Sequence, residues 1–123
     1  MKFTLEGGAS AYLIRGYSTS EIHVGEQRVT ASCIVTPERL LTDWGPATFA
    51  AFGPEHVPTL LGLSAELILI GTGMTQEFAP PAVRRALAAH AIGLEAMELG
   101  AACRTFNVLL QEGRRVAAVL FLR

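Results

Sequence analysis

The chain has 123 residues, of which 50% are hydrophobic and 17% are charged, and its mean hydropathy is +0.37. This length fits one compact domain and excludes a two-domain enzyme, and the apolar content excludes wholesale disorder. The formal net charge of -1 excludes an overall positive field that would gather nucleic acid. We therefore predict a single domain over residues 1–123, with residues 1–10 loosely ordered.

The cysteines, the histidines and the apolar segments indicate whether the chain binds a metal and in which cellular compartment it acts. Cys33 and Cys103 lie far apart in the sequence, and the three histidines show no paired spacing, so we predict no metal site and no cofactor. No apolar run approaches the roughly 20 residues that a membrane span needs, and the N-terminus shows no apolar signal region. These features predict a cytoplasmic protein without a membrane span.

The first third of the chain has the alternation that is typical of β-strands. Apolar residues alternate with polar ones on both sides of the pair Gly25-Glu26, at Ile22, Val24, Val29, Ala31 and Cys33. This pattern predicts a hairpin whose second strand ends at Pro37. A further short strand is predicted over residues 40–44, and the prolines and glycines over residues 45–62 predict loops with at most one helical turn.

From residue 66 onward, strand and helix patterns alternate. Residues 66–70 form an apolar run that predicts a strand buried on both faces, and Pro81 opens a helix because its fixed φ suits the first helical position. Later segments predict a strand, a helix and a final strand, over residues 94–97, 99–112 and 116–122. This βαβαβ order predicts a parallel or mixed sheet whose last strand is central, with the N-terminal hairpins added to it or forming a second sheet.

The Gly-rich turn after residues 66–70 is the best candidate for contact with a small ligand, because ligands of open α/β sheets bind beyond the carboxyl ends of strands. It is not a dinucleotide fingerprint, since Gln76 stands where the third glycine is required. Either the glycines satisfy a tight turn, or backbone amides, hydroxyls and a nearby arginine hold an anion. The candidate ligand-binding residues are Gly71, Thr72, Gly73, Thr75, Arg84 and Asn107.

The two cysteines are candidate nucleophiles. Cys103 follows the start of its predicted helix and precedes Arg104, and both influences lower the pKa of a thiol. No base is identifiable beside it, and it shares an apolar stripe with Phe106, so we predict a buried side chain for Cys103 and for Cys33. The sequence therefore predicts no catalytic residue.

Four further residues have structural interpretations, and for Asn107 and Trp44 a functional alternative stays open. Asn107 either ties its helix to a neighbouring loop, which we favour, or lines a pocket. Glu95 either faces solvent or, as we favour, pairs with an arginine such as Arg114. His90 fits a favourable contact with a helix C-terminus, and Trp44 either lines the core, which we favour, or anchors a partner.

The segments IGTG, GLEAME and AACRTFNVLLQEGRRVAAVL carry a family resemblance. They resemble domain-of-unknown-function family 498, which includes the mitochondrial respiratory complex I assembly factor three. The resemblance implies a single-domain α/β fold of three layers, β/β/α, with a mixed sheet, and a partner-dependent role in building a respiratory complex. It transfers no catalytic residue. The matching signature positions are Gly71, Gly73, Pro81, Glu95, Thr105, Asn107, Glu112 and Arg114.

Two functional hypotheses follow. The first is a non-enzymatic interaction protein similar to assembly factors, with a protein partner and with a homodimer as a further option. The second is a domain that binds a small anion, or a modest enzyme, using the Gly-rich turn. The chain shows no presequence of the mitochondrial kind, which predicts a bacterial protein.

Overall fold

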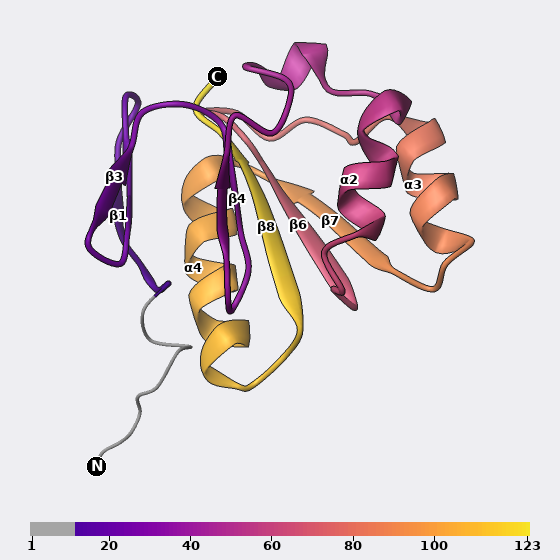
Figure 1. Cartoon of the computed structure of the whole chain (residues 1–123). Helices are drawn as coiled ribbons and strands as arrows, with labels where there is room; N and C mark the ends of the chain where they lie inside the picture. The colour runs from indigo at the N-terminus through magenta and orange to yellow at the C-terminus, as the bar shows by residue number, and fades with distance from the viewer. Residues whose placement is uncertain (1–11) are drawn as a thin grey trace.

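The computed structural model describes residues 12–123, so the expectation for residues 1–10 lies outside the described part of the chain. Within these residues, two sheets and three α-helices make up a mixed α+β fold (Figure 1). The smaller sheet has three antiparallel strands in the order β1-β2-β3, which are β1 (Ile14–Tyr17), β2 (Ile22–Val24) and β3 (Gln27–Val29).

The larger sheet has five strands in the order β5-β4-β8-β6-β7. The central strand β8 (Val116–Phe121) pairs in parallel with β6 (Leu67–Thr72), and β6 pairs in parallel with β7 (Gly93–Met97). On its other side β8 pairs antiparallel with β4 (Cys33–Val35), which forms a hairpin with β5 (Leu40–Thr42). The prediction of a mixed sheet with a central last strand is confirmed.

The predicted hairpin is confirmed over β2 and β3, but the extension of its second strand to Pro37 is wrong. The chain leaves the small sheet after Val29 and enters the large sheet at Cys33. Between the two strands, the Ser32 hydroxyl donates a hydrogen bond of 2.6 Å to the Pro46 carbonyl. The apolar alternation continues across this break because Val29 and Cys33 are buried in the same core cluster.

Two hydrophobic cores form because alternate side chains of the large sheet point to opposite faces. One face packs against the small sheet and against α4 (Leu99–Gln111), and Val116, Ala118 and Leu120 of β8 point into it. The other face packs against α2 (Val57–Leu61) and α3 (Pro81–Ala88), as Figure 1 shows on the right of the sheet. Burial on both faces explains the continuous apolar runs of β6 and β8.

The Pro- and Gly-rich segment packs on the second core. It contains two short 3-10 helices, η1 (Phe49–Ala51) and η2 (Pro54–His56), and α2 follows directly. The ring centroids of Trp44 and Phe52 lie 6.3 Å apart, and both rings pack against the ring of Phe121 in the central strand. This aromatic cluster covers the carboxyl end of β8.

Candidate functional site

The Gly-rich turn lies at the carboxyl end of β6, and its own hydrogen bonds hold it in place. The buried Thr72 hydroxyl lies 2.6 Å from the Thr75 carbonyl and 3.2 Å from the Met97 carbonyl, and it accepts a hydrogen bond from the Glu77 amide. These contacts use the one donor hydrogen and one of the two acceptor positions of the hydroxyl. Thr72 therefore fixes the turn and has no free hydroxyl hydrogen to donate to a ligand.

The two glycines are constrained in different ways, Gly73 by its backbone conformation and Gly71 by close packing. Gly73 has a φ of 95°, and a Cβ there would lie 3.4 Å from the Cα of Arg123. A Cβ on Gly71 would lie 3.2 Å from the Cβ of Ala102, because β6 packs closely on α4. The interpretation as a tight turn is supported at Gly73, whereas Gly71 lies within β6 and is limited by its packing against α4.

A groove of about 300 Å³ opens beside the turn, at the start of α4. Its lining is largely apolar and comes from three elements: the β1–β2 turn, the turn after β6, and the first residues of α4. Met74 is 64% exposed and Tyr17 is 44% exposed. The lining residues are Tyr17, Ser18, Thr19, Met74, Glu98, Leu99 and Gly100, and we call this surface the carboxyl-edge groove.

Tyr17 is held in place by α4. A Cβ on Gly100 would overlap the Tyr17 hydroxyl, so the absence of a side chain at position 100 makes room for the ring. The Arg104 guanidinium donates a hydrogen bond of 2.8 Å to that hydroxyl. The groove could not be predicted from the sequence, because β1 and α4 are distant along the chain. Its one local signal is a glycine, Gly100, within an apolar helix.

The N-terminus of α4 is occupied by a carboxylate of the chain itself. Glu98 is the N-cap residue, and its side chain accepts hydrogen bonds from the amides of Gly100 and Ala101. Arg104 lies 3.6 Å from the same carboxylate. The amides that would attract an anion are thus already satisfied, and Glu98 adds a negative charge to the groove.

The structure does not bring Arg84 and Asn107 to the Gly-rich turn. Arg84 of α3 is exposed and donates a hydrogen bond of 3.0 Å to the Leu94 carbonyl on β7. Asn107 of α4 accepts a hydrogen bond from the Ile14 amide and donates one to the Ile14 carbonyl, both at 2.8 Å. The two residues lie on opposite faces of the large sheet. Asn107 has a structural contact, but it ties α4 to the strand β1 and not to a loop.

The favoured pairing of Glu95 with Arg114 is wrong. Glu95 is exposed on β7, and Arg114 lies 3.6 Å from the carboxylate of Glu66. The backbone amide of Arg115 also donates to that carboxylate, and this hydrogen bond is the main cause of the lowered pKa of Glu66. Glu66 and Gly93 are neighbours across the sheet, so sequence distance alone could not tell which carboxylate Arg114 would meet.

The remaining candidates have structural surroundings. Cys33 and Cys103 are both buried and free, and desolvation raises the pKa of each thiol to about 12. The His90 ring nitrogen lies 3.1 Å from the Ala86 carbonyl near the end of α3, as expected. Trp44 is half-buried, and its buried indole nitrogen has no hydrogen-bond partner in the described chain.

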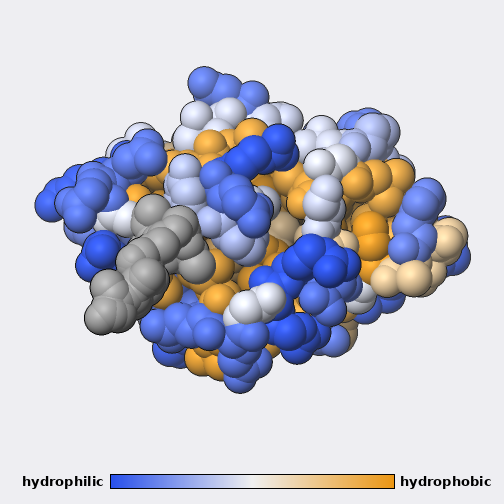
Figure 2. All heavy atoms as spheres, turned by 60° about the horizontal axis from the view of Figure 1, so that its bottom comes forward, coloured by the Kyte–Doolittle hydropathy of each residue, from blue (hydrophilic) through white to orange (hydrophobic). Residues whose placement is uncertain are grey.

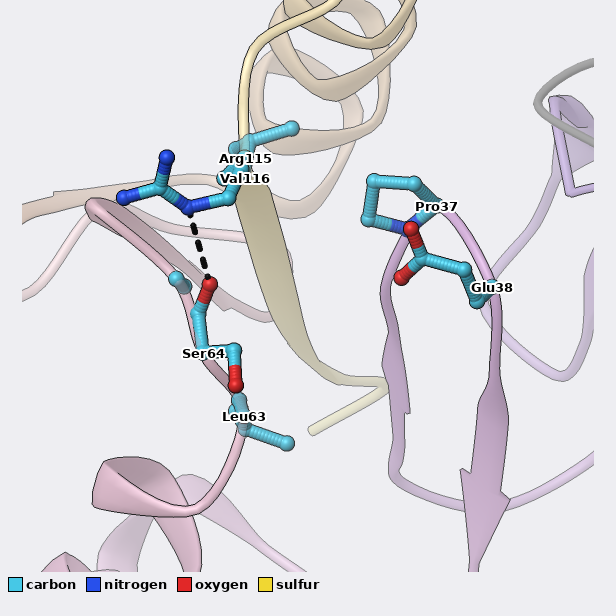
Figure 3. Close-up of a pocket in the computed structure, with 7 residues that line it drawn as sticks. Pro37, Glu38, Leu63, Ser64, Arg115 and Val116 are labelled. Carbon is cyan, nitrogen blue, oxygen red and sulfur yellow. Dashed lines mark hydrogen bonds between the residues drawn. The ribbon is translucent and has the colours of Figure 1, made fainter.

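A second, smaller pocket of about 100 Å³ lies at the opposite end of the large sheet (Figure 3). It separates Pro37 and Glu38, at the tip of the β4–β5 hairpin, from Ser64 and from Arg115 at the start of β8. The Arg115 side chain donates a hydrogen bond of 3.3 Å to the Ser64 carbonyl, so its Nε is already used. Figure 2 turns this end of the molecule forward and shows mainly hydrophilic residues with hydrophobic patches between them.

Within residues 12–123, no group of three or more His, Cys, Asp or Glu side chains could hold a metal ion. None of the helices described for the chain has the length and apolar character needed to cross a membrane.

Comparisons with known proteins add the family. The family model described as "Protein of unknown function (DUF498/DUF598)" matches residues 14–121. The NADH dehydrogenase [ubiquinone] 1 alpha subcomplex assembly factor 3 of Bos taurus is 30% identical over 112 residues, which cover 89% of this chain and 60% of that protein. The chain therefore spans less than two thirds of the length of these curated relatives.

Solved structures share the fold. A Xanthomonas campestris protein matches with a TM-score of 0.83 and 36% identity, over 99% of this chain and 92% of that one. A Bordetella pertussis protein described as an Mth938-like domain matches with a TM-score of 0.78 and 25% identity, over 98% of this chain and 92% of that one. A Bartonella henselae protein described as an outer membrane protein matches with a TM-score of 0.75 and 32% identity, over 92% of this chain and 96% of that one.

Proposed function

The chain belongs to the DUF498/DUF598 family of proteins of unknown function, and from this premise we propose that it is a non-enzymatic protein-binding module that acts in the assembly of a respiratory complex. Relatives that match about nine tenths of the chain are named as assembly factors of NADH dehydrogenase. The partner of such a module is a subunit or an intermediate of the complex that is being built.

The carboxyl-edge groove is the observation that carries this proposal. Large apolar side chains that stay exposed in a folded chain are typical of surfaces that bind another protein. Met74 and Tyr17 border the groove, and its volume accommodates one large side chain from a partner. Arg104 fixes Tyr17 before binding, so less side-chain entropy is lost when the partner arrives.

The surroundings of the nucleophile candidates also favour binding over catalysis. Both thiols are buried with raised pKa values, so neither forms a thiolate near neutral pH. The Thr72 hydroxyl is engaged by backbone groups of its own turn. No observation favours an anion in the groove, because Glu98 already caps the helix that would bind it.

Affinity purification of the tagged chain from its host tests this function. We expect the wild type to recover subunits of a respiratory NADH dehydrogenase, identified by mass spectrometry, and the Met74→Asp variant to recover at least about tenfold less, because a charge would have to be buried. Val108→Asp is the matched control, since Val108 is 54% exposed on α4 and lies outside the groove lining. Equal recovery by the wild type and Met74→Asp would contradict the proposal.

A cytoplasmic location is part of the same proposal. Both cysteines are free, which fits a reducing compartment. Fractionation of cells that express the tagged chain at native level should place it with the cytoplasmic fraction. Recovery with the outer membrane, the location in the description of the Bartonella henselae relative, would overturn this part of the proposal.

A further inference from the structure

The strand β7 is an edge of the large sheet, and its outer side is unpaired among the described residues (Figure 1). In a parallel strand, alternate residues direct both backbone groups to the same side. Gly93 donates its amide to Glu66 beside β6, so Leu94 and Ala96 direct their amides and carbonyls away from the sheet. An extended chain can pair with these four groups.

The outer side of β7 is covered only lightly. The Arg84 guanidinium bonds to the Leu94 carbonyl at 3.0 Å, and the Gln76 side-chain amide lies 3.5 Å from the Ala96 carbonyl. Both side chains are exposed, so each loses little when the amide of an added strand replaces it. These two contacts involve the carbonyls, and the amides of Leu94 and Ala96 have no hydrogen-bond partner within residues 12–123.

An exposed aromatic side chain lies on the loop that borders this edge. Phe78 is 85% exposed. It stands between Gln76, which reaches Ala96, and Ala79, which is buried in the same core as Leu94. A strand added to β7 would gain an apolar side chain to pack against as well as backbone hydrogen bonds.

The negative charge of Glu95 disfavours a second copy of β7 as the added strand. The antiparallel pairing that uses Leu94 and Ala96 of both copies places the two Glu95 residues directly opposite each other, with Cα atoms about 4.5 Å apart. Like charges directly opposite destabilise a strand pair. A strand with a basic residue opposite Glu95 gains a favourable cross-strand pair instead.

We propose that β7 accepts an extended segment of a partner protein as a sixth strand of the large sheet, with a basic side chain of that segment opposite Glu95. This inference rests on the proposed function only in that the chain acts by binding proteins, because it uses a surface other than the carboxyl-edge groove.

Nuclear magnetic resonance titration of the full-length, ¹⁵N-labelled chain tests the proposal. The probes are two blocked peptides of alternating threonine and valine that differ only in a central lysine or a central glutamate. The lysine peptide should shift the amide resonances of Leu94 and Ala96 and slow their hydrogen exchange. The glutamate peptide should bind about threefold or more weakly, because it places like charges opposite each other.

Ala96→Pro removes one outward amide without touching the pairing of β7 with β6, since proline is tolerated where an edge amide faces solvent. Ala96→Pro should lower the affinity for the lysine peptide about tenfold or more. Ala96→Ser keeps the amide and should bind the peptide with the affinity of the wild type. Glu95→Lys provides a variant with an intact backbone, and it should reverse the preference between the two peptides.

Three results would overturn the inference. They are resonance shifts confined to residues outside β7, equal affinity for both peptides, and shifts of Leu94 and Ala96 that grow with protein concentration without peptide, which would identify a second copy as the occupant. Met74→Asp should leave peptide binding unchanged, so failure of the groove proposal and failure of this one are distinguishable.

Discussion

Replacement of Asn107 by alanine tests how the small sheet is attached to the rest of the fold. The Asn107 side chain makes two hydrogen bonds of 2.8 Å, one to the amide and one to the carbonyl of Ile14. Ile14 is buried in the core that β1 shares with α4, and β1 is an edge of the small sheet. These two bonds therefore satisfy backbone groups that the sheet itself leaves unpaired.

The expected loss of stability follows from these contacts. Each hydrogen bond contributes about 1 kcal/mol net, so the loss of both costs about 2 kcal/mol. Alanine is a better helix former than asparagine by about 0.5 kcal/mol, which offsets part of this loss. We expect Asn107→Ala to lower the free energy of unfolding by about 1.5 kcal/mol, which corresponds to a fall in Tm of about 5 °C.

Urea unfolding of the wild type and the variant measures this difference, and hydrogen exchange reports on the Ile14 amide. Val108→Ala is the control, because the Val108 side chain lies next to Asn107 in sequence but is largely exposed. The exchange of the Ile14 amide should accelerate in Asn107→Ala and not in Val108→Ala. A loss below about 0.5 kcal/mol, with unchanged exchange at Ile14, would refute the reasoning.

Three further predictions concern the turn, a carboxylate and the thiols. Gly73→Val should destabilise the fold by about 1–3 kcal/mol in urea, because valine is strained at positive φ. The pKa of Glu66 is lowered in the folded state, chiefly by the backbone amide of Arg115. The ionised carboxylate therefore stabilises the fold at pH values above its unfolded pKa of 4.5, and this stabilisation is lost as the pH falls below 4.5. The Tm difference between the wild type and Glu66→Gln should therefore shrink below pH 4.5, and a constant difference would contradict this cause. Cys33 and Cys103, with pKa values of about 12, should resist a thiol reagent at pH 8 until the chain is unfolded, and rapid labelling of the native chain would show that they are accessible.

Most elements were predictable because their signals are local. The apolar run of β6, the proline that opens α3, and the glycine that ends α4 each depend on neighbours within a few residues. The break between β3 and β4 could not be predicted, because Val29 and Cys33 point into one core from two different sheets. The alternation reports which side chains are buried and not which sheet buries them.

The candidate site was harder to predict because it depends on contacts between distant segments. The Gly-rich turn follows β6 as the sequence predicts, and the positive φ of Gly73 fits its interpretation as a tight turn. Arg84 and Asn107 were grouped with this turn by their chemistry, yet the fold places them on opposite faces of the sheet. Tyr17 could not be assigned to the groove, since its position depends on β1 packing across α4.

Photo-crosslinking from the carboxyl-edge groove tests the central claim most directly. A photoreactive phenylalanine analogue replaces Met74 in the full chain expressed in its host, and a second sample carries the analogue at Val108. Both positions are more than half exposed, so the reagent is equally accessible to solvent. We predict that position 74 forms a covalent adduct with one subunit of a respiratory NADH dehydrogenase while position 108 does not. Adducts of the same proteins from both positions, or none from position 74, would contradict the claim that this groove binds a partner.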